Sequence, residues 1–372
     1  MVRAKQWVLK NTPDFGAPFN FDNDDPNATF ELKSFDISPD DLKKGEILVE
    51  TYLLSNDPAQ KFWIATVDRN YSKGTQLGEN IPARGIGKIL ASKNDNYSVG
   101  DYVTGRLCWT TAIIIGDPIA ADVRKICPEE GDELWWYLSV YGSTALTAYF
   151  IFYKYLGLSE TEKHYGKQFL ISGAAGAVGT ICVQLAVNVF KASKVIAIAG
   201  GSEKINYLES LGKVVVGVDY KDERFEQNLI KAAAENSVDY FVDNVGGSIL
   251  DIGVKTLKIQ GTIIACGSIS GYNHPEELVF KNYVSVITKR LTLKGLLVTD
   301  CRENFPEAMK KLKKLVKDKS IDAKHSATLV DAEDDKFIYV PTIWSGLFQG
   351  INRGKLITVV KGMDQSRFAK GE

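Results

Sequence analysis

The spacing of apolar residues along this chain changes near residue 167. Before it, short apolar runs separated by Gly and Asp turns predict strands at 46–54, 84–90, 100–105 and 111–115. A helical pattern follows at 141–158, with Ser143 or Thr144 as its cap. Residues 1–140 are therefore expected to be rich in β-structure.

From residue 167 onward, apolar strands alternate with amphipathic helices. Strands are predicted at 168–172, 194–199, 214–218, 238–243, 261–266 and 291–298. Helices are predicted at 177–190, 203–211, 223–235, 247–258, 276–289 and 303–317. This alternation is typical of a parallel, doubly wound sheet.

Strand character returns at 341–347 and 354–361, after that sheet is complete. A terminal strand of this kind is expected to rejoin the first part of the chain. The predicted fold class is therefore α/β, with a doubly wound, Rossmann-like domain at 141–340 inserted into a β-rich domain made of 1–140 and 341–372.

Three glycines, Gly173, Gly176 and Gly179, join the first of these strands to the first helix. Their spacing is typical of a dinucleotide-binding loop, where they permit a tight turn, backbone approach to a pyrophosphate and close helix packing. The helix start would offer free N–H groups and a positive dipole end to phosphates. The alternative is an ordinary strand–turn–helix with small residues at a packing contact.

The composition of the chain limits the classes of function that the protein can have. The 372 residues suggest two domains, and a net charge of −1 gives no basic footprint for nucleic acid or an anionic membrane. Five cysteines without a C-x-x-C pair indicate a reducing compartment, and three histidines away from them predict no metal site. No signal segment and no apolar run of about 18 residues is visible. A cytoplasmic location is therefore expected, with nuclear entry left open.

The residues after the second Rossmann strand indicate which dinucleotide cofactor the domain binds. No acid stands directly at the end of 194–199, where NAD enzymes hold the adenosine ribose. Lys204 could face a 2′-phosphate, and Tyr220 could add a hydroxyl donor. We therefore expect NADPH as the cofactor. The alternative is that both side chains are solvated surface residues.

Several segments together resemble the medium-chain dehydrogenase/reductase superfamily. They are LSNDP at 54–58, LTAY at 146–149, GAAGAVG at 173–179, AGGSEK at 199–204, DNVGG at 243–247, CGSISGYN at 266–273 and NRGK at 352–355. They look like the zinc-independent branch of prostaglandin reductases (leukotriene B4 12-hydroxydehydrogenases) and plant alkenal double-bond reductases. The G-H-E segment and four clustered cysteines of the zinc-binding relatives are missing from this sequence.

The resemblance implies a GroES-like fold for the β-rich domain and a set of cofactor contacts. The phosphates of NADPH would be held by Gly176, Ala177, Val178, Gly179, Lys204 and Tyr220. The ribose and nicotinamide would lie along Asn244, Cys266, Gly267, Ser268, Ile269, Ser270, Leu296, Leu297, Val298 and Asn352. Asn244 and Cys266 also follow strands, at the carboxyl ends where open α/β sheets bind ligands.

The substrate would meet Asn56 and Tyr272, and the resemblance implies no metal. Where the family has D-P-Y-M-R, this chain has DPAQK at 57–61, so Ala59 replaces an aromatic residue and leaves the substrate's shape open. Segment 159–166 is longer than is usual in the family.

Reduction of an activated C=C bond needs few protein groups, because NADPH supplies the hydride to the β-carbon. Tyr272 is the candidate donor to the developing enolate oxygen, or it serves only as a wall of the pocket. We expect a reductase of α,β-unsaturated aldehydes or ketones. An NADPH:quinone reductase of the same fold and a non-catalytic NADPH-binding sensor are the alternatives.

The predicted strand 291–298 should lie at one edge of the sheet. An edge strand exposes unpaired N–H and C=O groups, and this one is too apolar to be left bare. We therefore expect a homodimer in which two copies of the strand pair around a two-fold axis. A monomer whose edge is shielded by a loop such as 272–275 is the alternative.

Overall fold

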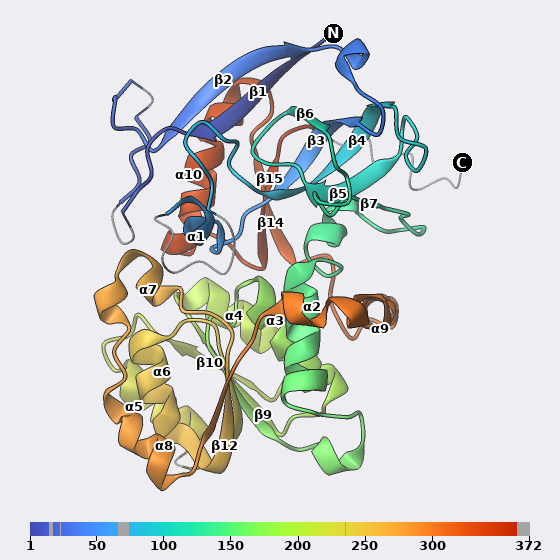
Figure 1. The fold of residues 1–372 in the computed structure, drawn as a ribbon. Helices are drawn as coiled ribbons and strands as arrows, with labels where there is room; N and C mark the ends of the chain where they lie inside the picture. The colour runs from blue at the N-terminus through green and yellow to red at the C-terminus, as the bar shows by residue number, and fades with distance from the viewer. Residues whose placement is uncertain (15–17, 23, 66–73, 235, 363–372) are drawn as a thin grey trace. The chain divides into compact units, whose positions relative to one another are not determined.

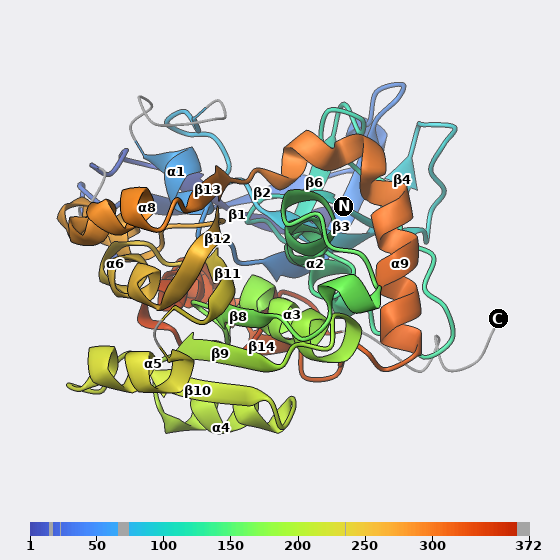
Figure 2. The same cartoon turned by 90° about the horizontal axis from the view of Figure 1, so that it is seen from below.

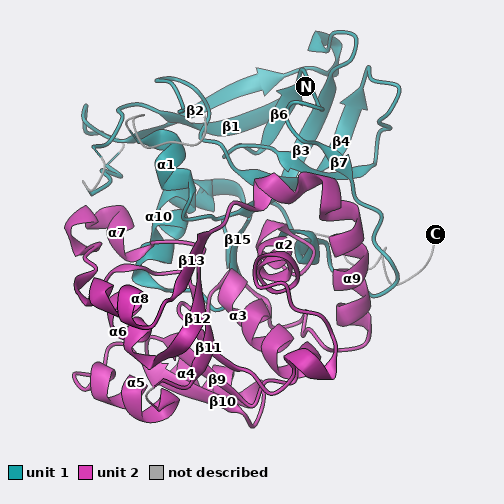
Figure 3. Ribbon diagram, turned by 60° about the horizontal axis from the view of Figure 1, so that its bottom comes forward, with its two compact units in different colours: residues 1–138, 328–372 teal, residues 139–327 magenta. Residues whose placement is uncertain are grey.

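The structure of the chain is a computed structural model that describes residues 1–14, 18–22, 24–65, 74–234 and 236–362 (Figure 1). It divides into two compact units, which are coloured separately in Figure 3. Unit 1 is Met1–Leu138 with Thr328–Glu372, and unit 2 is Ser139–Ala327. Each unit is described below by itself.

Unit 2 is built on a parallel sheet. In its described part, six strands follow the order β10-β9-β8-β11-β12-β13, and the neighbouring strands pair in parallel. This is the doubly wound order of a Rossmann fold, with β8 at its centre. The strands are β8 (Gln168–Ile171), β9 (Lys194–Ala199), β10 (Val215–Asp219), β11 (Val238–Asp243), β12 (Leu257–Ala265) and β13 (Thr292–Gly295).

Helices cover both faces of this sheet. In Figures 1 and 2, α5 (Phe225–Ala233), α6 (Gly247–Gly253) and α8 (Val284–Thr288) lie on one side, and α2 (Ser143–Phe150), α3 (Ala177–Gln184) and α9 (Phe305–Lys317) lie on the other. Helix α4 (Ser202–Ser210) packs against β10. Buried Leu170, Ile196, Phe241 and Ile263 from the strands meet Leu229 of α5 in one apolar core.

Unit 1 contains antiparallel structure from both chain ends. Its two-stranded sheet is β1 (Val2–Leu9) with β2 (Phe30–Ile37). Among the described residues, a larger sheet has the order β14-β15-β3-β4-β5-β7, and β6 also pairs with β3. These strands are β3 (Ile47–Ser55), β4 (Arg84–Ser92), β5 (Tyr102–Arg106), β6 (Ala112–Ile115), β7 (Arg124–Lys125), β14 (Ala327–Asp331) and β15 (Lys355–Val359).

The core of unit 1 is aromatic and joins distant parts of the chain. The Phe30 ring lies 5.4 Å from that of Trp109, which in turn lies 5.6 Å from Trp344. The indole N–H of Trp7 donates to the carbonyl of Phe337. The predicted α/β fold, a Rossmann sheet inserted between two parts of a β-rich domain, is thus confirmed.

Two predicted features near the C-terminus differ from the structure. Residues 341–347 were expected to be a strand, but Val340–Ser345 forms helix α10, because Val340, Ile343 and Trp344 are buried at helical spacing. The chain also returns to unit 1 earlier than the expected boundary after residue 340. The reason is β14, which already pairs beside β15 in the unit 1 sheet.

Three predictions in the second half of unit 2 were too long. The predicted helix 247–258 ends at Gly253 in α6, and β12 already begins at Leu257. The predicted helix 276–289 is broken into η8 (Pro275–Glu277), η9 (Lys281–Tyr283) and α8, because Asn282 hydrogen-bonds to Asp251 instead of continuing a helical ladder. The predicted strand 291–298 is only Thr292–Gly295. Its partner β12 ends at Ala265, opposite Gly295, so no ladder is available beyond that point.

Candidate active site

The glycine loop connects β8 to the first turn of α3. Gly173 has φ +57°, a left-handed conformation that favours glycine. A Cβ on Gly179 would lie 2.3 Å from the Gly173 carbonyl oxygen, so the helix start approaches its own loop too closely for any side chain. The predicted phosphate-binding residues Gly176, Ala177, Val178 and Gly179 all lie at this helix start.

The carboxyl ends of β8 and β11 are tied together by side chains. Buried Ser172 donates from Oγ to Asp243 Oδ1 at 2.6 Å. Asn244 donates from its backbone N to Ser172 Oγ at 2.9 Å and from Nδ2 to the Ser172 carbonyl at 2.7 Å. The predicted ligand Asn244 is therefore held at the strand ends, with Nδ2 occupied.

The Asp243 carboxylate organises the turn after β11. It accepts hydrogen bonds from the N–H groups of Val245 and Gly246 in addition to the Ser172 hydroxyl. Burial raises the pKa of Asp243 above its usual range, although these donors act in the opposite direction. Sequence analysis missed Ser172 and Asp243 as site residues. The DNVGG match included Asp243, but its partner Ser172 lies far away in sequence.

The predicted segment Cys266–Tyr272 leaves the end of β12 and is joined to the same turn. The N–H groups of Cys266 and Gly267 donate to the carbonyl of Asp243 at 2.8 and 3.2 Å. Ser270 donates from Oγ to the Val245 carbonyl at 2.7 Å. The structure thus brings Asn244 together with residues 266–270 at adjoining strand ends.

Close backbone approach also shapes this segment. A Cβ on Gly267 would lie 3.0 Å from the Asn244 carbonyl oxygen, which favours glycine there. Burial, with a smaller contribution from Asp243, raises the pKa of the Cys266 thiol to about 12. Cys266 is therefore a neutral thiol at physiological pH, and it is no candidate nucleophile.

Tyr272 belongs to the short helix α7 (Ser270–Asn273) that follows this segment. Its backbone N–H donates to the carbonyl of Ile269, and the residue is half-buried. Leu296, Leu297 and Val298 follow β13, which pairs beside β12. They therefore follow the edge strand at the same end of the sheet as Cys266.

Two further predicted residues follow β9 and β10. Lys204 lies in the first turn of α4, and burial lowers its pKa from the usual value. Tyr220 follows the end of β10, donates its N–H to the Ala199 carbonyl, and is 46% exposed. Both residues thus follow neighbouring strands, at the carboxyl end of the sheet.

The two remaining predicted residues, Asn56 and Asn352, belong to unit 1 and are both buried. Asn56 donates from Nδ2 to Thr358 Oγ1 at 2.9 Å, while no donor among the described residues reaches its Oδ1. Asn352 donates from Nδ2 to the Gly354 carbonyl at 2.6 Å. Both amides therefore make local contacts that fix the end of β3 and the turn before β15.

Beside Asn56, Lys355 and Asp57 form an ion pair. Lys355 donates to the Asn56 carbonyl at 2.6 Å and to Asp57 Oδ1 at 2.7 Å. Burial alone would raise the pKa of Asp57, but the Lys355 ammonium and the Ser55 hydroxyl hold it below its usual range. The LSNDP and NRGK segments thus meet in unit 1.

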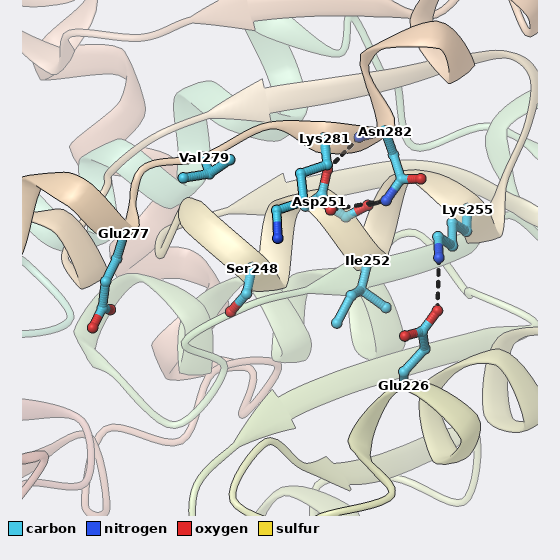
Figure 4. Close-up of a pocket in the computed structure, with 9 residues that line it drawn as sticks. All are labelled: Glu226, Ser248, Asp251, Ile252, Lys255, Glu277, Val279, Lys281 and Asn282. Atoms are coloured by element: carbon cyan, nitrogen blue, oxygen red, sulfur yellow. Dashed lines mark hydrogen bonds and ion pairs between the residues drawn. The ribbon is translucent and has the colours of Figure 1, made fainter.

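A hollow of about 750 Å³ lies elsewhere on unit 2 (Figure 4). Within its lining, Lys255 pairs with Glu226, and Asn282 donates to Asp251. The predicted cofactor and substrate residues are absent from its lining, so we do not place the chemistry there.

The described residues were also considered as metal ligands and as membrane-spanning helices. In that part of the chain, no three His, Cys, Asp or Glu side chains gather as a metal site. No helix there is long and apolar enough to cross a bilayer.

Comparison with family models gives two matches. Residues 5–123 match the N-terminal domain of oxidoreductase, and residues 177–314 match the family described as zinc-binding dehydrogenase.

Among the relatives that match nearly the whole chain are the following three. The "Uncharacterized membrane protein YML131W" of Saccharomyces cerevisiae is 60% identical over 97% of this chain and 99% of its own. Prostaglandin reductase 1 of Bos taurus is 31% identical over 96% of this chain and 99% of its own. The NADP(+)-dependent 2-alkenal reductase of Nicotiana tabacum is 29% identical over 96% and 98%.

Solved structures show the same fold. CurA from Vibrio vulnificus in complex with NADPH has a TM-score of 0.80 at 23% identity, covering 96% of this chain and 100% of that one. Escherichia coli quinone oxidoreductase complexed with NADPH has a TM-score of 0.67 at 17% identity, covering 95% and 99%.

The yeast relative contradicts one expectation from the sequence. Its name places that relative among membrane proteins, so the expected cytoplasmic location was wrong. The expectation rested on the lack of an apolar run, which bears only on spanning helices.

The relatives agree with the expected cofactor. NADPH, as predicted, is the cofactor of this oxidoreductase. The chain belongs to the zinc-independent medium-chain dehydrogenases/reductases, in the branch of the prostaglandin and 2-alkenal reductases.

Proposed function

We propose that this protein reduces the C=C bond of α,β-unsaturated aldehydes or ketones with NADPH. The observation that carries the proposal is the hydrogen-bonded junction of β8, β11 and β12, from which segment 266–272 leads directly to Tyr272. The names of the bovine and tobacco relatives support the same substrate class.

The proposed cofactor contacts fit this chain's backbone. Gly179 and Gly267 allow close packing of the chain's own backbone that a Cβ would prevent, the first at the helix start and the second beside Asn244. We assign the pyrophosphate to Gly176–Gly179 and the 2′-phosphate to Lys204 and Tyr220. The ribose and nicotinamide are assigned to Asn244, residues 266–270, residues 296–298 and Asn352.

NADPH, when bound, supplies the hydride for the reduction. The chain's part is to hold the substrate carbonyl and stabilise the charge that develops on its oxygen. In the proposal Tyr272 donates a hydrogen bond from Oη to that oxygen, because a fixed donor favours the enolate over the starting carbonyl. Asn56, whose Oδ1 receives no donor within the described residues, is assigned to the substrate side.

The direct test is NADPH oxidation against a panel of 2-alkenals, enones and quinones. We expect turnover of enals and enones with kcat/KM well above that of quinones. Turnover of quinones alone would contradict the proposal and favour the quinone-reductase alternative, which the fold of the Escherichia coli enzyme and Ala59 both allow. NADPH binding without turnover of any compound would instead indicate a sensor.

We also propose that two copies of the chain pair through β13. This strand is the edge of the described sheet, and its four residues are all exposed. Exposed apolar side chains lie along the same stretch, at Tyr283, Val284, Ile287, Leu293 and Leu297. Pairing β13 with its copy would satisfy its backbone groups and cover part of this surface.

A further inference from the structure

A second lysine, Lys221, lies beside the residues assigned to the 2′-phosphate. It follows Tyr220 directly after β10, and its backbone N–H donates to Asp219 Oδ1 at 2.9 Å. A Cβ on Gly200 would lie 2.8 Å from the Tyr220 ring and 2.9 Å from Lys221 Cε. The absence of a side chain at Gly200 thus provides the space in which both side chains pack over the end of β9.

The two lysines are close enough to repel each other. After burial, the Lys221 ammonium is the next cause that lowers the pKa of Lys204, while Glu203 acts in the opposite direction. Within the described residues, the Lys221 ammonium forms no ion pair. Two ammonium groups, one from the first turn of α4 and one from the loop after β10, are therefore held close together, which costs free energy that a bound anion would offset.

We propose that Lys221 is a second cationic contact for the 2′-phosphate of NADPH and a determinant of the preference for NADPH over NADH. A phosphate monoester carries close to two negative charges at neutral pH and has three acceptor oxygens. One ammonium cannot neutralise it, whereas Lys204 and Lys221 together can. NADH lacks this phosphate, so Lys221 contributes nothing to its binding.

This inference rests on NADPH as the cofactor and on the assignment of Lys204, and not on the substrate. It therefore calls for a binding measurement, which stays informative even if enal reduction is disproved. The probes are NADPH, NADH, 2′,5′-ADP and 5′-AMP, titrated into the full-length protein and followed by calorimetry or fluorescence.

The variants are Lys221→Gln, Lys204→Gln and the double substitution, with Lys213→Gln as the matched control. Lys213 is an exposed lysine before the start of β10, away from the carboxyl end of the sheet. We expect Lys221→Gln to raise the Kd of NADPH and 2′,5′-ADP by about tenfold, the loss of one charge-assisted bond. The Kd of NADH and 5′-AMP should stay unchanged, and Lys213→Gln should leave all four constants unaltered.

Further results separate the roles of the two lysines. The double variant should bind 2′,5′-ADP more weakly than either single variant, and the salt dependence of binding should fall with each lysine removed. An unchanged Kd for 2′,5′-ADP in Lys221→Gln would overturn the proposal. Equal weakening of NADPH and NADH would also overturn it, because Lys221 would then support the fold of the loop and not the phosphate.

Discussion

Asp243 shows how one buried side chain can hold several parts of a site. Its carboxylate accepts from Ser172 after β8 and from two backbone N–H groups of its own turn, and its carbonyl accepts from the segment after β12. The turn itself follows from the local sequence, since a short acid often bonds the backbone two or three residues on. The bond to Ser172 could not be predicted, because it depends on β8 and β11 being neighbours.

We predict that Asp243→Ala lowers the free energy of unfolding by on the order of 3 kcal/mol. The substitution leaves three donors, the Ser172 hydroxyl and the N–H groups of Val245 and Gly246, without their buried acceptor. Urea unfolding followed by fluorescence measures the loss. Ser172→Ala removes only one of these donors and should cost clearly less. Equal losses for the two variants would show that the carboxylate does not organise the turn.

Lys61 is a fully buried ammonium in α1 (Gln60–Ile64) of unit 1. Its Nζ lies 5.0 Å from the centre of the Phe19 ring and 6.0 Å from that of Phe348. Burial lowers its pKa from 10.5 to about 8. The unfolded chain therefore binds this proton more tightly than the folded protein does between these two pH values.

It follows that the Lys61 contribution to the free energy of unfolding rises with pH between about 8 and 10.5. Below that window both states are protonated, so the full burial penalty remains. We predict that the stability of Lys61→Met relative to wild type falls as pH increases through the window, measured by urea unfolding at several pH values. Lys213→Met serves as the exposed control. A difference between Lys61→Met and wild type that is independent of pH would refute the prediction.

At the scale of elements, the central strands could be predicted closely and the end of unit 2 could not. The apolar runs of β9 and β11 are bounded by turn residues, and both strands have the predicted bounds. The stretch 276–289 contains apolar residues at mixed spacing, and the Asn282–Asp251 contact that breaks it joins residues far apart in sequence. For α10, the spacing of Val340, Ile343 and Trp344 did contain the helical signal.

The backbone of the glycine loop lies so close to Gly179 that it leaves no space for a side chain there. Gly179→Ala places a Cβ 2.3 Å from the Gly173 carbonyl oxygen and 2.6 Å from Ala174 Cα, so the loop or the helix start must shift. We expect a loss of about 1–3 kcal/mol in unfolding free energy, typical of overpacking, together with weaker NADPH binding.

The control is Gly116→Ala, where a Cβ would meet only Glu46 Oε1 at 3.6 Å, an ordinary contact. Thermal unfolding and NADPH titration of both variants compare them directly. If Gly179→Ala matched Gly116→Ala in both measurements, the loop would not be as tight as the structure indicates.

At the scale of the whole molecule, the sequence predicted a Rossmann domain inserted into a β-rich one. That prediction was based on the change, near residue 167, from a β-rich pattern to alternating strands and helices. The site was less accessible to sequence reasoning. Motif matches named the proposed cofactor residues, but the contacts of Ser172, Asp243 and Lys221 depend on neighbours that only the folded sheet provides.

The proposed dimer is tested by mass in solution. Light scattering should give about twice the 41.1 kDa of one chain. Leu293→Pro removes one N–H from the exposed edge strand and should shift the protein toward monomer. A wild-type mass equal to one chain would reject pairing through β13.

The central claim is that the hydride adds to the β-carbon of an enal. The most direct measurement uses NADPH deuterated at the transferred position, a 2-alkenal substrate, and mass spectrometry with NMR of the product. We predict a saturated aldehyde labelled on the β-carbon, and a kcat at least about tenfold lower in Tyr272→Phe with an unchanged Kd for NADPH. An allylic alcohol labelled at the carbonyl carbon would contradict it.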